Sequence, residues 1–287
     1  MKFLIIIPTH NEEENVLLCL ESLRKQTFQD FSCIVVNDGS TDNTKIIVEH
    51  FIENVRLSGV KAANFDLRNL PKSEHHPGAK VVRTFNKGLE GISLDKFDVI
   101  CKFDADIIFP ENYLEEVNKI YENNSKAGMV SGLVYIQKSG NWEFENLSSK
   151  NHVRGPVKSY SVQCFKDMNG LRPVLGWDNI DVMLAQMHGW EVITIKDIWV
   201  KHLRPTAYKY KKQKAEKLGQ YFYNIGLNLP LAFVSSAKSS LKNKSISEFF
   251  ITMKSFLKQK SERVLSPSEI SYIRNLRWNQ MLRKNSG

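Results

Sequence analysis

The sequence FLIIIPTHNEEENVLLCLESL, residues 3–23, joins an apolar run to a polar turn and then to a segment with helical spacing. A continuous apolar run such as residues 3–7 is typical of a central parallel strand that is covered on both faces. Pro8 ends this strand. Asn11 is expected to cap a helix whose first turn holds three glutamates, which the positive end of the helix dipole favours. The stretch therefore predicts the first strand–helix unit of an α/β fold.

The alternation of strands and helices continues through the first hundred residues. The expected elements are strands at residues 31–36, 60–65 and 98–103, a helix after a cap at Thr41 or Asp42, a polar loop at residues 66–78 and a helix at residues 79–93. Strands and helices that alternate at this spacing are typical of a doubly wound parallel sheet. The sequence thus predicts an α/β, Rossmann-like, mostly parallel sheet flanked by helices.

The rest of the chain shows fewer strand patterns and ends in a helical segment. The expected elements are a helix from Pro110 to about residue 122, strands at residues 129–136 and 191–200, and a short helix at residues 178–188. From Thr206 onward the sequence has no strand pattern. Residues 206–287 are therefore predicted to form a helical C-terminal extension.

Composition limits the class of protein. The chain has 287 residues, of which 42% are hydrophobic and 25% charged, and this excludes a wholly disordered or collagen-like chain. No apolar run approaches the roughly 18 residues that a membrane-spanning helix needs. The four cysteines lie far apart without a CxxC pair, so we expect free thiols in a reducing compartment. These features predict a cytoplasmic protein.

The charge is distributed unevenly. Residues 201–287 contain 18 Lys and Arg against 4 Asp and Glu, a net charge of +14, whereas the whole chain carries +9. Aromatic and aliphatic residues alternate with the basic ones, and this argues against a nucleic-acid-binding arm. Phe249, Met253, Phe256 and Leu257 have helical spacing, and a basic amphipathic helix is typical of peripheral contact with the inner face of an anionic membrane. The alternative is a helix packed on the rest of the protein.

Three polar clusters follow predicted strands, at residues 8–12, 37–40 and 104–106. Ligands bind at the carboxyl ends of the strands in open parallel sheets, so we expect the three clusters to share one crevice. The sequence has neither a GxGxxG nor a GxxxxGK[ST] motif, which excludes two common ways of binding phosphate. Asp104 and Asp106 are suited to Mg²⁺ or Mn²⁺, with the remaining ligands coming from phosphate oxygens.

Three motifs in this order resemble those of the family-2 glycosyltransferases, which have the GT-A fold. FLIIIPTHNEEENVLLCLESL resembles the strand-one motif of that family, VVNDGSTDNT its usual DDGSTD, and CKFDADIIFPENYLEE its DxD motif. The resemblance covers about residues 2–205. It implies a nucleotide-sugar-binding half at residues 1–110, an acceptor-binding half at residues 111–205, and an extension at residues 206–287 outside the shared core.

The resemblance also implies roles for individual residues. Those that match nucleotide-binding positions are Pro8, Thr9, His10, Glu12, Asp38, Arg83 and Asp104. Those that match metal-binding positions are Asp104, Asp106 and His202, the last within an HxRP sequence. Asn37 replaces a common aspartate of the family. Residues 78–88 resemble the glycine-then-arginine-asparagine helix of the family, but with two extra residues before Asn86. An ordinary surface arginine therefore stays open as the alternative for Arg83.

A catalytic base is expected in the sequence Gly-Trp-Asp-Asn-Ile-Asp at residues 176–181. Inverting members of the family carry an E-D-x-D stretch at the start of a helix that ends in glycine and an aromatic residue. Asp178 lies 11 residues before Gly189, which matches the position of the base, and Asp181 is the second candidate. Positions i and i+3 share a helix face, so both carboxylates are expected to face the crevice.

The resemblance implies a metal-dependent inverting glycosyltransferase. It would move a sugar from a nucleotide-diphosphate sugar, a UDP-sugar by preference, to a hydroxyl of a saccharide or lipid-linked acceptor in cell-surface polysaccharide or glycolipid synthesis. One alternative is a sugar-nucleotide or headgroup nucleotidyltransferase, but the usual glycine-rich first loop with Arg or Lys is absent. Another is an inactive nucleotide-binding module with a basic tail, against which Asp38, Asp104, Asp106 and Asp178 argue.

Overall fold

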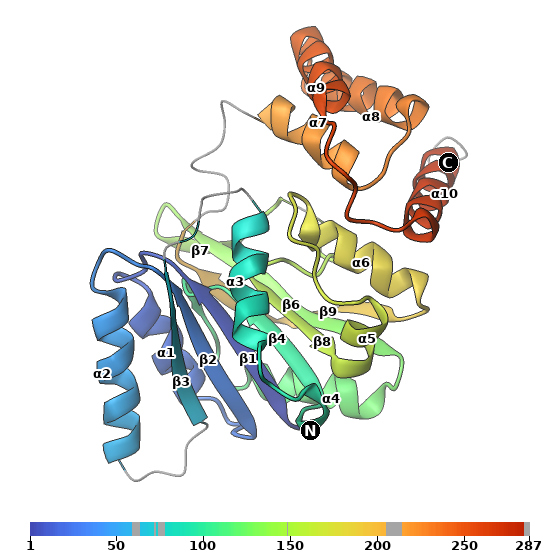
Figure 1. Cartoon of the computed structure of the whole chain (residues 1–287). Coiled ribbons are helices and arrows are strands. Elements are labelled where there is room, and N and C mark those ends of the chain that lie inside the picture. Colours follow the sequence, from blue (N-terminus) through green and yellow to red (C-terminus); the bar gives the residue numbers. More distant parts are fainter. Residues whose placement is uncertain (59–63, 72, 74–77, 148, 205–213, 284–287) are drawn as a thin grey trace.

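A computed structural model describes residues 1–58, 64–71, 73, 78–147, 149–204 and 214–283 (Figure 1). The strands among these residues are β1 (Phe3–Thr9), β2 (Phe31–Asp38), β3 (Asn64–Leu70), β4 (Val99–Phe103), β5 (Ile107–Ile108), β6 (Ala127–Lys138), β7 (Asn141–Phe144), β8 (Val157–Ser161) and β9 (Glu191–His202). They form one mixed sheet in the order β3-β2-β1-β4-β8-β6-β9-β5, with β7 paired to β6. Strands β1 to β4 run parallel, and β8 continues the sheet antiparallel to β4.

Helices cover both faces of the sheet (Figure 1). They are α1 (Val16–Arg24), α2 (Thr44–Leu57), α3 (Ala79–Leu89), α4 (Tyr113–Asn123), α5 (Val162–Asp167), α6 (Trp177–Met187), α7 (Lys214–Asn224), α8 (Leu229–Lys242), α9 (Ile246–Lys258) and α10 (Pro267–Arg283). Helices α1, α2 and α4 contribute to the core on one face, and α3, α5 and α6 to the core on the other. The predicted α/β sheet flanked by helices is confirmed.

Strand β1 shows why a continuous apolar run predicts a central strand. Successive side chains of a strand point to opposite faces. Accordingly Phe3, Ile5 and Ile7 join one core while Leu4 and Ile6 join the other. All five side chains are buried. An apolar side chain is therefore expected at each of these five positions.

Two local predictions in the first hundred residues are wrong. The first helix begins at Val16, because Asn11 has a φ of 54° and its side-chain oxygen accepts a hydrogen bond from the backbone N–H of Thr41 at 2.8 Å instead of capping a helix. The third strand is Asn64–Leu70, in the segment expected to be a loop. Part of the strand predicted at residues 60–65 and part of that loop lie outside the described residues.

Other boundaries differ by a few residues. Helix α3 ends at Leu89 instead of residue 93, because Gly91 takes a positive φ of 76° and the chain turns there. Helices α4 and α6 and strands β6 and β9 occupy the predicted segments within about three residues, as such boundaries usually do. All four cysteines are free and buried, as expected.

The described part of the C-terminal extension consists of helices α7 to α10 and the short segments between them, as predicted. It is packed on the rest of the protein. Phe222, Leu231 and Ile273 belong to the core that α3 and α6 share, and Arg172 donates to Glu269 of α10 at 2.7 Å. No helix in the described ranges is both long and apolar enough to span a membrane.

Candidate active site

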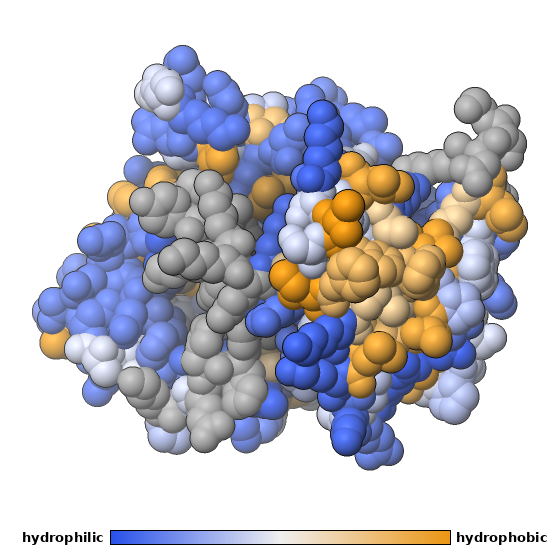
Figure 2. Space-filling view, turned by 90° about the horizontal axis from the view of Figure 1, so that it is seen from above, coloured by the Kyte–Doolittle hydropathy of each residue, from blue (hydrophilic) through white to orange (hydrophobic). Residues whose placement is uncertain are grey.

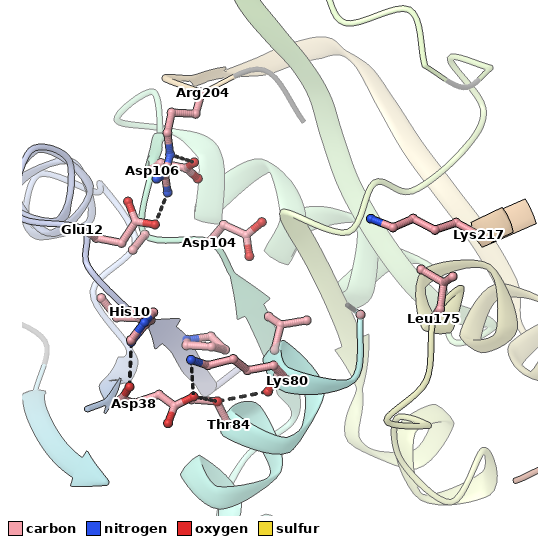
Figure 3. Close-up of a pocket in the computed structure, with 15 residues that line it drawn as sticks. His10, Glu12, Asp38, Lys80, Thr84, Asp104, Asp106, Leu175, Arg204 and Lys217 are labelled. Atoms are coloured by element: carbon pink, nitrogen blue, oxygen red, sulfur yellow. Dashed lines mark hydrogen bonds and ion pairs between the residues drawn. The ribbon is translucent and has the colours of Figure 1, made fainter. Parts of the chain in front are cut away.

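A pocket of about 470 Å³ opens where β1, β2 and β4 end (Figure 3). Its lining residues are Pro8, Thr9, His10, Glu12, Asp38, Gly78, Lys80, Val81, Thr84, Asp104, Ala105, Asp106, Leu175, Arg204 and Lys217. The three polar clusters that follow the strands therefore meet in one crevice, as the sequence predicts. Pro8, Thr9, His10, Glu12, Asp38, Asp104 and Asp106 all line it.

Asp38 is the buried acid at the end of β2. Its carboxylate accepts hydrogen bonds from Ser73 N–H at 3.0 Å, Ser73 Oγ at 2.6 Å and Thr84 Oγ1 at 3.1 Å, and Lys80 Nζ lies 3.3 Å away. Burial raises the pKa of Asp38, but the Ser73 hydrogen bonds and the Lys80 charge outweigh it and hold the pKa below its usual value. Asp38 is therefore an anion at neutral pH, held at the wall of the pocket by Ser73, Thr84 and Lys80.

A chain of charged groups closes the other side of the pocket. Arg204 donates to Glu12, and through Nε to Asp106 Oδ2 at 3.3 Å (Figure 3). His202 lies next to Asp106 because β5 pairs with β9 in the register Ile107↔His202. Its Nε2 is 3.5 Å from Asp106 Oδ2, and its Nδ1 is 3.4 Å from Glu145 Oε2. The predicted neighbours Asp106 and His202 are thus brought together from positions about a hundred residues apart.

The carboxylates around His202 keep its imidazole protonated. Burial lowers the pKa of His202, but the hydrogen bonds to Asp106 and Glu145 outweigh it and raise the pKa to about 9. Burial likewise raises the pKa of Asp106, and the contacts with His202 and Arg204 bring it below its usual value. Two cations therefore neutralise Asp106 in this state.

The donor atoms around Asp106 fit a divalent cation that takes most of its ligands from phosphate. One carboxylate and one imidazole are adjacent, and Glu145 contacts the second ring nitrogen of the imidazole, an arrangement common behind metal-bound histidines. In the described residues no cluster of three or more His, Cys, Asp or Glu side chains could hold a metal ion. Asp106 and His202 thus fit a partial site that phosphate oxygens must complete.

Two buried lysines lie beneath the pocket. Lys102 on β4 and Lys158 on β8 are partners in the sheet register, and their ammonium groups are 5.2 Å and 5.3 Å from the centroid of the Trp177 ring. Lys102 donates to Asp104 and, at 3.3 Å, to the carbonyl of Gly155. Asp104 therefore has a fixed cationic partner in addition to its position in the pocket.

The two candidate bases on α6 have different surroundings. Both oxygens of Asp181 accept from Lys158 Nζ, at 2.7 Å and 2.8 Å, and Oδ2 also accepts from Tyr160 Oη at 2.7 Å. Asp181 is buried, so the expectation that it faces the crevice is wrong. The Asp178 side chain is half-buried, and within the described residues its carboxylate forms no hydrogen bond or ion pair. Neither acid lines the pocket, but Leu175, one turn earlier, does.

Helix α3 supplies a cation other than the predicted one. Arg83 is on the exposed side of the helix and does not line the pocket, whereas Lys80 and Thr84 do. The extension supplies another, because Lys217 of α7 reaches the pocket (Figure 3). The crevice therefore includes a residue of the extension as well as residues of the shared core. Glu145 was also missed, and its segment carried no motif.

Comparisons with known proteins agree on the family. The model of glycosyl transferase family 2 matches residues 4–172. The glycosyltransferase GlyG of Streptococcus pneumoniae is 27% identical over 49% of this chain and 42% of its own length. The uncharacterized glycosyltransferase YibD of Escherichia coli is 34% identical over 54% of this chain and 42% of its own. This chain thus spans less than half the length of either relative.

Solved structures share the fold. Residues 1–349 of Staphylococcus aureus TarS in complex with UDP-GlcNAc align with a TM-score of 0.58 and 20% identity, over 91% of this chain and 76% of that one. A mannosyltransferase from Pyrobaculum calidifontis, in complex with GDP-Man and Mn²⁺, aligns with a TM-score of 0.58 and 16% identity, over 98% and 75%. The GT-A fold implied by the sequence motifs is confirmed, and the chain belongs to the family-2 glycosyltransferases.

Proposed function

We propose that the protein is a metal-dependent inverting glycosyltransferase that moves a sugar from a nucleotide-diphosphate sugar to an acceptor hydroxyl. The observation that carries this proposal is the pocket at the strand ends, where Asp38, Asp104 and Asp106 meet in a chain of family 2. A UDP-sugar is the donor we favour, since TarS was solved with UDP-GlcNAc. The acceptor is a saccharide or a lipid-linked saccharide of cell-surface polysaccharide or glycolipid synthesis.

The pocket has separate groups for the parts of such a donor. Asp38 and the β1 turn with His10 would hold the base and ribose, while Lys80, Arg204 and Lys217 bring positive charge for the diphosphate. Asp106 and His202 would hold Mn²⁺ or Mg²⁺, which when bound supplies positive charge to the leaving diphosphate. Asp104 contributes a partly exposed carboxylate that Lys102 keeps in place. Stabilising the charge that develops on the leaving group is the largest contribution expected from these residues.

Asp178 is the base in this proposal. A general base needs a carboxylate free to accept a proton, and Asp178 meets this requirement while Asp181 is engaged by Lys158 and Tyr160. Asp178 is in the first turn of α6, next to the pocket residue Leu175. Attack by the activated acceptor hydroxyl opposite the leaving diphosphate inverts the anomeric carbon.

The protein is proposed to act in the cytoplasm, at the inner face of the membrane where a lipid-linked acceptor is found. Four free, buried cysteines suit a reducing compartment.

A panel of nucleotide sugars with Mn²⁺, scored for binding and for slow donor hydrolysis, identifies the donor. Asp178→Asn is expected to lower turnover by roughly 100-fold or more with little change in donor affinity, since it removes only the proton acceptor. Asp197→Asn, an exposed acid on β9 away from the pocket, is the matched control and should leave turnover unchanged. Full turnover by Asp178→Asn excludes it as base, and equal donor affinity with and without EDTA excludes the metal.

A further inference from the structure

Helices α8 and α9 form a hairpin with large apolar side chains on its outside. Phe233 and Leu241 of α8 and Ile246, Phe250 and Leu257 of α9 have relative exposures between 54% and 80%. We call these five residues the outer apolar face. Figure 2 looks down on this end of the molecule and shows a hydrophobic patch there with hydrophilic atoms around it. Single exposed apolar residues are ordinary, but a contiguous group of this kind marks an interaction surface.

The outer apolar face is continuous across the two helices. At about 100° per residue, Ile246, Phe250 and Leu257 fall within about 40° of one another around α9. The rings of Phe233 and Phe249 are 5.1 Å apart, and those of Phe249 and Phe250 are 5.3 Å apart, so the two helices share an aromatic seam.

The exposed stripe differs from the one expected from the sequence. Phe256, which the spacing placed on the same stripe as Leu257, is buried together with Thr252 in the contact between α9 and α7. Helix α9 therefore uses one side for packing and leaves the other outside. The alternative of a helix packed on the rest of the protein is thus correct for one side of α9, and the other side is exposed.

The segment that carries the outer apolar face also carries exposed lysines. Residues 229–258 contain five lysines, Lys238, Lys242, Lys244, Lys254 and Lys258, and one acid, Glu248. All five are exposed, and within the described part of the chain none of them forms an ion pair. Glu248 accepts hydrogen bonds from the side-chain amide of Asn243. Residues 229–258 therefore carry five exposed positive charges against one negative charge.

We propose that the outer apolar face docks on the surface of an anionic lipid membrane, with its leucine, isoleucine and phenylalanine side chains at the acyl boundary and the lysines among the headgroups. Apolar burial together with attraction to anionic lipid is the general basis of interfacial binding. A second copy of the chain fits less well, because the two lysine borders would repel each other.

Docking in this way brings the pocket to the membrane. Helix α7 packs against α9 and also places Lys217 in the pocket, so the outer apolar face and the pocket are connected through one helix. A lipid-linked acceptor would then reach the pocket without leaving the bilayer. This last step rests on the proposed function, whereas the docking surface does not.

Point substitutions test the surface better than truncation. Removing the chain from about Ser235 would also remove Phe256 and Ile273, which are buried in the core. The double variant Phe250→Ser/Leu257→Ser changes only exposed side chains. Leu17→Ser/Leu18→Ser is its matched control, because both residues are exposed apolar positions on α1, a helix on the other face of the sheet.

The full chain is mixed with vesicles of phosphatidylglycerol and phosphatidylcholine, or of phosphatidylcholine alone, and binding is measured by co-sedimentation. We expect binding to the anionic vesicles at low salt, release at high salt, and weak binding to the neutral ones. Phe250→Ser/Leu257→Ser should weaken anionic-vesicle binding by about tenfold or more, and Lys238→Gln/Lys242→Gln/Lys254→Gln should weaken it and reduce its salt dependence. The α1 control should bind as the unchanged protein does.

Equal binding to both vesicle types, no binding to either, or unchanged binding by Phe250→Ser/Leu257→Ser overturns the proposal. A dimer in sedimentation velocity that this variant loses assigns the face to a second copy instead. UDP binding by calorimetry is measured on every variant and should not change. Membrane docking without nucleotide binding would support the docking surface and contradict the proposed function. Nucleotide binding without membrane docking would support the proposed function and contradict the docking surface.

Discussion

Two lysines lie side by side in the sheet and each pairs with an aspartate, but only one of the two aspartates lines the pocket. Lys102 pairs with Asp104, and Lys158, its register partner on β8, pairs with Asp181. The lysines are alike, with 2% and 0% of their side chains exposed. The aspartates differ, because the Asp104 side chain is 31% exposed and lines the pocket, whereas that of Asp181 is 2% exposed.

The same kind of lysine–aspartate pair therefore has different surroundings at the two positions, and we expect a different role for each. Asp104 keeps part of its carboxylate accessible, so a ligand can compete with Lys102 for it. Asp181 is almost fully buried and does not line the pocket. Its partner Lys158 also contacts the start of α6, because its Nζ donates to the carbonyl of Asp178 at 2.6 Å. We therefore expect Asp181 to act as a positioning residue for the proposed base, through the contacts that Lys158 makes with both.

The largest effect on stability is expected from breaking the buried pair. Asp181→Asn leaves Lys158 charged in the interior without its counter-ion, and removing one partner of a buried pair costs about 3–5 kcal/mol. The free energy of unfolding, measured by urea denaturation, should fall by that amount. Asp197→Asn should leave the free energy of unfolding unchanged, because Asp197 is exposed. A loss below about 1 kcal/mol together with a fall in turnover of about 100-fold would instead identify Asp181 as the base.

Removing both members of the pair should cost less than removing one. In Lys158→Met/Asp181→Leu the buried charges disappear together, and apolar side chains of similar volume fill their space. We expect the double variant to recover at least about 2 kcal/mol relative to the sum of the single substitutions, the signature of direct coupling. Tyr160 loses its acceptor, so recovery stays incomplete. Additive single effects would contradict the coupling.

The sequence is most informative where a residue's neighbours are close in the chain. Strands β1, β2 and β4 were predicted because apolar runs lie between two cores, and their carboxyl ends located the pocket. Strand β3 was misplaced because, in the described part of the chain, Asn64–Leu70 lies at the sheet edge beside β2, and four of its seven residues are polar. An edge strand of that kind lacks the continuous apolar pattern.

Contacts between distant segments were the part that the sequence could not provide. The register that brings Lys102 opposite Lys158 depends on β8 inserting between β4 and β6. No local pattern encodes that topology. A lysine within the otherwise apolar strand Val99–Phe103 was the one local signal for this cluster. For the same reason, the sequence alone cannot decide between Asp178 and Asp181 as the base. Lys158 engages the Asp181 carboxylate only in the folded chain.

A substitution in the partly exposed pair, Lys102 and Asp104, should change ligand affinity more than the free energy of unfolding. Asp104→Asn keeps an oxygen that accepts from Lys102, and solvent reaches the site, so the loss of stability should stay below about 1 kcal/mol. Affinity for UDP with Mn²⁺ should fall by about tenfold, because the charged oxygen facing the ligand is lost. Calorimetry measures the affinity and urea denaturation the stability. A stability loss as large as that of Asp181→Asn would remove the distinction between the two pairs.

The smallest expected effect uses His152 as a reporter of the Lys158 charge. Burial lowers the pKa of His152 most, and the positive charge of Lys158 lowers it further, to about 4. The folded protein therefore keeps His152 neutral, while the unfolded chain takes up a proton as the pH falls below about 6.5. Stability should fall between about pH 6.5 and pH 4, by about 1–2 kcal/mol after allowance for the partial exposure of the ring.

His152→Gln should remove this part of the pH dependence, measured as the free energy of unfolding at pH 7 and pH 4.5. In Lys158→Met/Asp181→Leu the nearby positive charge is gone, so the pKa of His152 should rise. It should stay below 6.5, because burial, the larger cause, is unchanged. Chemical shifts of the imidazole, followed by NMR during a pH titration, measure this directly. An unchanged His152 pKa in the double variant would mean that the charge of Lys158 is fully compensated by Asp181, and that the buried pair has no net effect on the titration of His152.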